Sequence, residues 1–521
     1  MKKIFALLIV VIICFYVGGC SPKPDTGATG KDHLENTLVY AGEAESTINP
    51  LLNSHEELPE LIFSGLMKYD AKGKPVPELA ESYTYEPETF TYTFHLRKGV
   101  KWHDGKEFTA EDVVYTYTEL TKDKTLAASI TSNYEDITNV TAPDKYTVVM
   151  KLRQYDAAIV DYFTMGILPS HLLKGKDIHT AAFNQAPVGT GRYKFLSWDR
   201  AGGMITMERN EAYYGKIPNI KRIVYRTVSD ETAKATMLHS HEADLAWLNA
   251  NYAKQFEGQK AFRSWKFSTA DYRGAAMDMA SAFWQKNADS IGVLHYAIDK
   301  NAIVQSVLNG QGHIAYSPIQ LNPLGTNSAA DIYPYDLTKF AQEMEKLGWV
   351  KGSDGIYARH GEKFHFTIQT REYEEERVAI AKLMSSMLKQ VGVDMEIVLV
   401  TKFNWTAGYN GFLAGFATQF DSDMIYSQFV TGASGNTMHY SNAEVDRLLA
   451  EGRHTQNIAA RKKIYGKFEE VYARSPGILL VAYMDGNYVG MSGIEGLDTT
   501  RVLGHHSVGV MWNIENWQIT R

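Results

Sequence analysis

Cysteine is nearly absent from this chain of 521 residues, which contains only Cys14 and Cys20. Both occur within the first 20 residues, and Cys14 lies inside an apolar run. The rest of the chain therefore has no pair of cysteines that could form an internal disulfide. Its stability must come from packed hydrophobic cores, and its length predicts roughly two to four domains of ordinary size.

An excess of basic residues is also lacking. The chain has 53 Lys and Arg against 60 Asp and Glu, and its formal net charge is −7. Without a basic stripe, we expect no nucleic-acid partner. Aromatic residues, by contrast, are plentiful, at 31 Tyr, 22 Phe and 9 Trp. Such a surplus is typical of a cleft that holds a ligand, but large α/β cores also use aromatic residues, so both interpretations stay open.

Motifs of catalysis are missing as well. The sequence contains no Gly-x-Ser-x-Gly elbow, no His-Glu-x-x-His helix and no Gly-Lys-Thr phosphate loop. The run Gly189-Thr190-Gly191 lacks the third glycine and the βα context of a dinucleotide site. We therefore expect a protein that is not an enzyme and that has no intrinsic cofactor.

The first 20 residues read MKKIFALLIVVIICFYVGGC, with two lysines, an apolar run and then small residues. This is the order of a secretory signal, and the apolar run is too short to predict a transmembrane span. The ending VGGC resembles a bacterial lipobox. It predicts a signal peptide over residues 1–20, lipid on Cys20 that anchors the protein to the outer face of the cell membrane, and a flexible tether over residues 21–35. The alternatives are a cleaved soluble secretory protein and an N-terminal helical anchor.

The body of the chain begins with a predicted strand, Asn36–Ala41. Apolar residues at helical spacing predict a helix from Glu56 to Leu66, which puts His55 at or near a helix N-terminus. Alternation from Phe90 to Leu96 predicts a strand with one buried face. A capping box then predicts a helix that begins after Thr109.

Three long runs carry a resemblance to a known family. They are YTFHLRKGVKWHDGKEFTAEDVVYTY from Tyr92, APVGTGRYKF from Ala186 and ERNEAYYG from Glu208. In this order they resemble the family 5 extracytoplasmic solute-binding proteins, the peptide and nickel receptors of ABC importers. The resemblance covers almost the whole mature chain, although Arg192 stands where the family usually has proline.

The resemblance implies an α/β fold of the two-lobed periplasmic-binding-protein type II, or Venus flytrap, with an inserted β-rich subdomain in the first lobe. It implies a lobe I of residues 36–80, 186–274 and 489–521, an inserted subdomain of residues 81–185, and a lobe II of residues 275–488. The residues independently favour α/β structure in lobe II, since a helical pattern over Val378–Val391 precedes a strand-like run over Met395–Thr401.

The implied function is capture of a small peptide, or of a nickel chelate such as nickel–histidine, by closure of the lobes. The ligand then passes to the permease and ATPase subunits of an ABC importer, and no bond is made. We expect a monomer, with nickel present only as part of the transported ligand. Two alternatives remain: an ordinary oligopeptide receptor without metal, and a surface lipoprotein for adhesion, signalling or chaperone-like contacts.

In the peptide receptors of the family, an aspartate after a late strand of the second lobe pairs with the ligand's α-amino group. Asp421 and Asp423 are the candidates here, and a helix N-cap is the alternative role for either. Arg371, in Thr370-Arg371-Glu372, resembles the start of a motif in nickel-chelate receptors and would clamp a ligand carboxylate. Its alternative is a surface pair with a nearby glutamate.

In the nickel-chelate members a histidine near the C-terminus binds the metal. His505 and His506 stand in about the right place, and His55 would approach from the same lobe. Adjacent residues of an extended segment point to opposite sides, so we expect only one of the pair to face the cleft. The alternative is a polar turn. His103 and the His239-Ser240-His241 run are assigned structural roles. Together, His55, Arg371 and the histidine pair favour the nickel chelate slightly.

Overall fold

The computed structural model describes residues 36–520, except 53–56, 124, 127–130, 320, 322–323, 325, 405–407 and 418–419. The expected signal peptide, the lipidated Cys20, the tether and His55 therefore lie outside the described residues. Residues Asn36–Arg521 cluster as one unit, apart from Met1–Glu35. Within the described part of the chain, no helix has the length and apolar character needed to cross a membrane.

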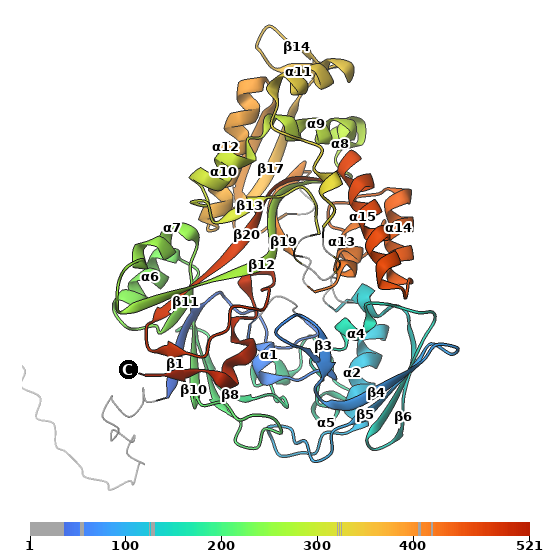
Figure 1. Cartoon of the computed structure of the whole chain (residues 1–521), viewed down its shortest axis with the longest axis vertical. Coiled ribbons are helices and arrows are strands. Elements are labelled where there is room, and N and C mark those ends of the chain that lie inside the picture. Colours follow the sequence, from blue (N-terminus) through green and yellow to red (C-terminus); the bar gives the residue numbers. More distant parts are fainter. Residues whose placement is uncertain are drawn as a thin grey trace, which may run out of the picture. The chain divides into compact units, whose positions relative to one another are not determined.

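An eleven-stranded mixed sheet organises the chain, in the order β18-β17-β19-β12-β20-β11-β1-β10-β9-β8, with β13 paired to β20 (Figure 1). Its strands are β1 (Thr37–Gly42), β8 (Tyr193–Asp199), β9 (Met204–Arg209), β10 (Arg222–Thr227), β11 (Leu245–Trp247), β12 (Phe262–Met277), β13 (Gly312–Ile314), β17 (His365–Arg371), β18 (Asp394–Val400), β19 (Gly411–Ala417) and β20 (Ile478–Met491).

The long antiparallel strands β12 and β20 connect the two lobes. β20 pairs with β11 of the expected lobe I, and β12 pairs with β19 of the expected lobe II. The expected lobe boundaries at 274–275 and 488–489 fall inside these two strands. Their register shifts between Ser268 and Tyr272, where Thr269 forms a bridge with Leu503 of the C-terminal tail. The tail therefore joins the sheet at the point where the strand pairing is irregular.

The segment expected to form the inserted subdomain contains a four-stranded antiparallel sheet in the order β4-β5-β7-β6, packed on helix α2. Its elements are β4 (Ala80–Glu86), β5 (Thr91–Leu96), α2 (Ala110–Lys122), η1 (Ser132–Tyr134), β6 (Ile137–Asp144), β7 (Thr147–Leu152), α4 (Ile159–Tyr162) and α5 (Ser170–Leu173). Tyr92, Phe94 and Leu96 are buried, and the capping box of Thr109 and Asp112 is formed. The predicted strand and helix start are both confirmed.

In lobe II, α12 (Glu375–Val391) lies beside β17 and is followed by β18, which confirms the predicted helix and strand. The helix ends at Gly392, whose φ of 97° is the left-handed conformation that glycine adopts readily. The other described helices of this part are α8 (Ala282–Asn287), η4 (Ala288–Ser290), α9 (Ile291–Leu294), η5 (His295–Ala297), α10 (Lys300–Ser306), η6 (Ser328–Ala330), α11 (Leu337–Lys346), η7 (Ser422–Ile425), α13 (Tyr426–Phe429), α14 (Ala443–Arg453) and α15 (Ile458–Arg474). Short strands β14 (Val350–Lys351), β15 (Tyr357–Arg359) and β16 (Glu362–Lys363) form a separate sheet.

The helix predicted from Glu56 to Leu66 is wrong in length, because α1 spans only Pro59–Ile62 and Phe63 is extended. Gly65 then approaches the Thr164 carbonyl so closely that an added Cβ would lie 2.5 Å from its oxygen. The chain continues into β2 (Met67–Tyr69), which pairs with β3 (Pro75–Pro77). Leu58, Leu61 and Leu66 are all fully buried. Their apolar spacing therefore results from burial in a core and not from a long helix.

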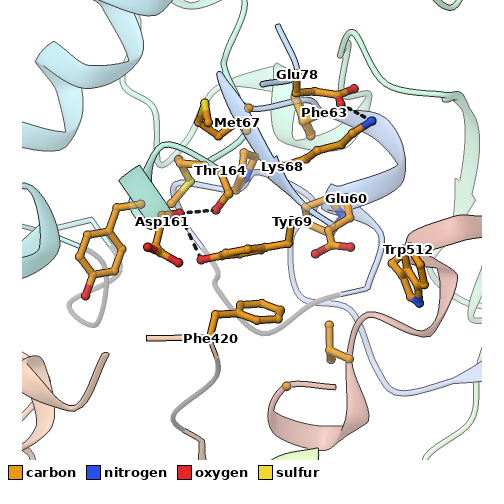
Figure 2. A pocket seen from close by; sticks show the side chains of 18 of the residues that line it. Glu60, Phe63, Met67, Lys68, Tyr69, Glu78, Asp161, Thr164, Phe420 and Trp512 are labelled. Carbon is orange, nitrogen blue, oxygen red and sulfur yellow. Dashed lines mark hydrogen bonds and ion pairs between the residues drawn. The ribbon is translucent and has the colours of Figure 1, made fainter. Parts of the chain in front are cut away.

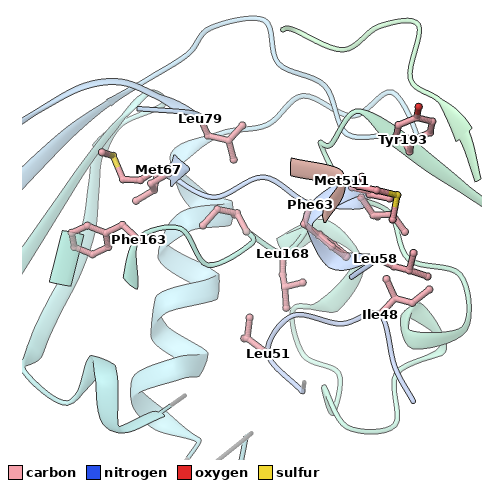
Figure 3. Packing of buried hydrophobic residues seen from close by; sticks show 14 of the residues in the cluster. Ile48, Leu51, Leu58, Phe63, Met67, Leu79, Phe163, Leu168, Tyr193 and Met511 are labelled. Carbon is pink, nitrogen blue, oxygen red and sulfur yellow. The ribbon is translucent and has the colours of Figure 1, made fainter. Parts of the chain in front are cut away.

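The C-terminal tail belongs to the core of lobe I. Figure 3 shows Met511 beside Phe63 and Leu58, in a cluster that also contains Phe163 and Leu168 of the inserted subdomain. The segments expected to form lobe I and the inserted subdomain therefore share one core. Lobe I also contains α6 (Glu231–His239) and α7 (Ala250–Ala253), and the tail contains β21 (Ile494–Glu495), η8 (His505–Ser507), η9 (Val510–Asn516) and β22 (Gln518–Ile519).

Candidate functional site

A cavity of about 640 Å³ lies between the lobes. One wall comes from the α1–β2 segment, α4 and the tail, and the other from the end of β19 and α13. In the lining, the ring of Tyr69 contacts that of Phe420, with 3.8 Å between the centroids and 30° between the ring planes (Figure 2). The volume is in the range of small-molecule sites, which run from roughly 300 to 1,000 Å³.

The described residues that line the cavity include five carboxylates and three basic side chains, which leaves an excess of acid. The acids are Glu60, Asp70, Glu78, Asp161 and Glu515, and the bases are Lys68, Arg192 and Arg501. Each base pairs with one acid: Lys68 with Glu78 at 2.5 Å, Arg192 with Glu515 at 2.7 Å, and Arg501 with Glu60 at 3.3 Å. Asp70 accepts two backbone N–H groups of its own turn.

Asp161 is the fifth carboxylate of the cavity. It is 9% exposed, and no Lys, Arg or His in the described ranges forms an ion pair with it. Tyr69 and Thr164 donate to its backbone carbonyl at 3.3 and 2.7 Å (Figure 2). Burial, together with the charge of Asp421, raises the pKa of the Asp161 carboxyl to about 8.

His505 lines the same cavity, and its position follows from the tail's pairing with the sheet. The Ala270 N–H donates to the Leu503 carbonyl at 2.8 Å, next to the register shift of β12. His505 then lies with Nδ1 at 2.9 Å from Oδ1 of Asp271.

The protonation of this pair follows from its surroundings. Burial would raise the pKa of Asp271, but Arg273 at 2.7 Å and His505 hold it well below its usual range. Burial lowers the pKa of His505 against the opposing charge of Asp271. Asp271 is therefore ionised at neutral pH and His505 is neutral, so Nδ1–H of the imidazole donates to the carboxylate.

His506 is not among the residues that line the cavity. Its φ of 54° turns the chain, and its Nε2 lies 3.5 Å from a guanidinium nitrogen of Arg377 on α12. Its backbone N–H donates to Asp271 at 3.3 Å. The two neighbouring histidines thus have different surroundings, with one at the cavity and the other against α12.

The other described site residues predicted from the sequence, Arg371, Asp421 and Asp423, do not line the cavity. Arg371 ends β17, donates to Glu374 at 3.2 Å and covers the ring of Phe403. Asp421 is the N-cap of η7 and pairs with Arg461 at 2.8 Å. Arg371 thus makes the pair with a nearby glutamate, and Asp421 the helix N-cap, that were the alternatives to ligand binding.

Asp423 is fully buried. It pairs with Arg453 at 2.7 Å and accepts from the Tyr162 hydroxyl at 2.9 Å. Because Tyr162 belongs to the inserted subdomain, this contact crosses between the lobes.

The histidines to which the sequence assigns structural roles contact other groups of the protein. His103 bonds Gly191 O and Gly189 N–H, at 3.0 and 3.2 Å, and burial lowers its pKa to about 4. His239 stacks on Phe256.

The sequence did not identify a second contact between the lobes, at the end of α14. His454 lies 3.0 Å from Asp136 and 2.8 Å from Gln154, both in the inserted subdomain. Arg453 donates to the Ser132 carbonyl at 3.3 Å. We call Arg453 and His454, with these partners, the α14 latch. Its members are about 300 residues apart in sequence, so no local pattern indicates them.

Comparison with known proteins decides the family. A family model described as "Bacterial extracellular solute-binding proteins, family 5 Middle" matches residues 74–441. The chain belongs to this family. It is 28% identical to Protein XP55 of Streptomyces lividans, over 94% of this chain and 91% of that one. It is 27% identical to the oligopeptide-binding protein AppA of Bacillus subtilis, over 99% and 98%.

Solved structures agree. NikZ from Campylobacter jejuni, in complex with Ni(L-His), superimposes with a TM-score of 0.86 at 29% identity, covering 93% of this chain and 99% of NikZ. The predicted two-lobed type II fold is confirmed. The protein is a substrate-binding protein of the ABC-importer kind, and its relatives are transport proteins and not enzymes.

Proposed function

We propose that this protein captures a nickel chelate, such as nickel–histidine, in the cavity between its lobes and delivers it to an ABC permease. The observation that carries the proposal is the Asp271–His505 pair at the cavity. Nickel favours imidazole nitrogen, and metal-binding histidines usually donate their other ring N–H to a carboxylate. Nε2 of the neutral His505 would be the ligand atom.

A chelator would supply the rest of the coordination sphere. The described residues contain no group of three or more His, Cys, Asp or Glu side chains placed to hold a metal. A single imidazole suits a metal that arrives already chelated, and NikZ, which is similar in fold and sequence, was solved with Ni(L-His). Nickel is then cargo and not a resident cofactor.

Capture of a short peptide without metal is the second candidate. The acid excess of the cavity favours it, because peptides carry an ammonium group. AppA of Bacillus subtilis is named as an oligopeptide-binding protein.

The lobe assignments made from the sequence are part of the proposal, with β12 and β20 as the hinge. Closure around the ligand draws its energy from contacts made only in the closed state. We further propose lipid on Cys20 as the anchor to the outer face of the cell membrane, a monomer, partnership with permease and ATPase subunits, and no enzymatic activity.

Calorimetry of the lipid-free protein with Ni²⁺ alone, with nickel–histidine and with a pool of di- to pentapeptides tests the function. We expect nickel–histidine to bind, Ni²⁺ alone to bind more weakly, and His505→Ala to weaken chelate binding at least about 10-fold. His313→Ala, an exposed histidine, is the control. Binding of peptides with no response to nickel–histidine would select the second candidate, and binding of neither would overturn both.

A further inference from the structure

Among the described residues, the Asp161 carboxyl has neither a cationic partner, as Glu60, Glu78 and Glu515 have, nor backbone N–H donors, as Asp70 has. The aspartates expected to receive a ligand's amino group, Asp421 and Asp423, already pair with Arg461 and Arg453. A ligand cation could reach either of them only by competing with a buried guanidinium. Asp161 can accept a cation without breaking an ion pair.

Two further acceptors line the same cavity. The side-chain carbonyl oxygens of Asn133 and Gln428 are buried and have no hydrogen-bond partner. Asn133 lies in η1, which packs against α4 and so against the element that carries Asp161. Gln428 comes from α13 of the opposite lobe. Unpaired buried acceptors are costly, so a group that donates to them is favoured.

A carboxylate and two carbonyl oxygens match an ammonium group, which has three N–H donors and no acceptor. We propose that Asp161, Asn133 and Gln428 form a subsite for the ammonium group of the transported ligand. This rests on the proposed function, since it requires the cavity to be the solute site. It narrows the ligand to molecules with a free amine, such as a short peptide or a chelate that retains an uncoordinated amino group.

The subsite also links the ligand to closure. Asn133 and Asp161 belong to the inserted subdomain and Gln428 to lobe II. An ammonium group held by all three joins the two sides of the cleft, and so stabilises the closed state over the open one.

Binding at this subsite releases a proton near neutral pH. The raised pKa leaves most of Asp161 protonated in the empty cavity at pH 7, and an ammonium neighbour ionises it. The other charged or titratable groups that act on Asp161 are Tyr69 of β2, Tyr83 of β4, Asp421 at the N-cap of η7, Asp423 within η7, and Arg461 of α15.

The test compares one tripeptide with its N-acetylated form, by calorimetry at pH 7 in two buffers of different ionisation enthalpy. For the unmodified protein, we expect the free-amine peptide to bind about 10- to 100-fold more tightly and to release up to about one proton. Asp161→Asn should lose both the preference and the proton release while its affinity for the acetylated peptide stays unchanged. Asp177→Asn, which changes an exposed aspartate outside the cavity lining, is the matched control.

Retention of the preference and of proton release in Asp161→Asn would overturn the subsite. Binding of nickel–histidine without any preference for a free amine would overturn the subsite and leave the proposed function standing. If the unmodified protein bound no peptide and no nickel–histidine, both would fall together.

Discussion

At the scale of single residues, Asp271 connects the hinge strand to the tail. It pairs with Arg273 and His505, and it accepts the backbone N–H of His506. We expect Asp271→Asn to lower the free energy of unfolding at pH 7 by about 3 kcal/mol, because it leaves Arg273 with one buried partner fewer. The measurement is urea unfolding, with Asp70→Asn as the control.

The pH dependence of this effect has a definite sign. The pKa of Asp271 is lower in the folded protein than in the unfolded chain, so its contribution is present above about pH 4. It is lost as the pH falls below that value. The difference between the native protein and Asp271→Asn should therefore shrink from pH 5 to pH 3, and a constant difference would contradict this account.

The contribution of Glu57 to stability changes with pH in the opposite direction. It is buried, it accepts the N–H groups of Gly509 and Met511, and burial raises its pKa to about 7. The folded protein therefore holds a proton that the unfolded chain releases near pH 4.5, and stability falls as the pH rises from about 4.5 to 7. Relative to Glu57→Gln, we expect the native protein to lose about 3 kcal/mol over this range in chemical unfolding experiments. Parallel curves for the two proteins would refute it.

At this scale the sequence identified His505 as a candidate but not its partner. Asp271 is 234 residues away and reaches His505 only because the tail pairs with the irregular part of β12. The sequence also did not reveal that Asp421 pairs with Arg461 and Asp423 with Arg453, because the two arginines come from other helices. Asp161 gave no local pattern at all.

At the scale of elements, the sequence predicted correctly those features that depend on residues close together in the chain. The alternation in β5 and the capping box of α2 depend on neighbours within a few residues, and both are present. The length of α1 was mispredicted because the apolar spacing that suggested a longer helix arises from a shared core. Its end depends on a close approach to Thr164, about 100 residues away.

The capping residue Asp112 has a larger role than its motif indicates. Besides the Thr109 N–H it accepts from Trp102 Nε1 and from the backbone and hydroxyl of Ser170. Asp112→Ala should therefore cost about 3 kcal/mol of unfolding free energy, more than a cap alone. Glu111→Ala, at the exposed neighbouring position, is the control in the same thermal or urea unfolding experiment. Equal effects of the two substitutions would contradict the assignment.

At the scale of the whole molecule, the family runs predicted two lobes and a cleft, and the fold is confirmed. What the sequence left open is which residues join the two lobes. The α14 latch joins lobe II to the inserted subdomain through His454 and Arg453. Contacts that join the lobes favour the closed state over the open one, so we expect the α14 latch to bias the equilibrium between them.

We expect His454→Ala to lower ligand affinity about 3- to 10-fold through faster dissociation, because it removes hydrogen bonds made only in the closed state. Stopped-flow dissociation and the radius of gyration from solution scattering measure the effect. His365→Ala, whose histidine pairs within lobe II, should leave both unchanged. An unaltered dissociation rate in His454→Ala would show that the latch does not contribute to closure.

The central claim is that the cavity between the lobes receives the solute, with His505 facing its metal. Anomalous diffraction at the nickel edge, from crystals grown with nickel–histidine, tests it most directly. The account predicts one strong peak inside the cavity, within coordination distance of His505 Nε2. A peak elsewhere, such as beside His239 or His241, together with an empty cavity would contradict it.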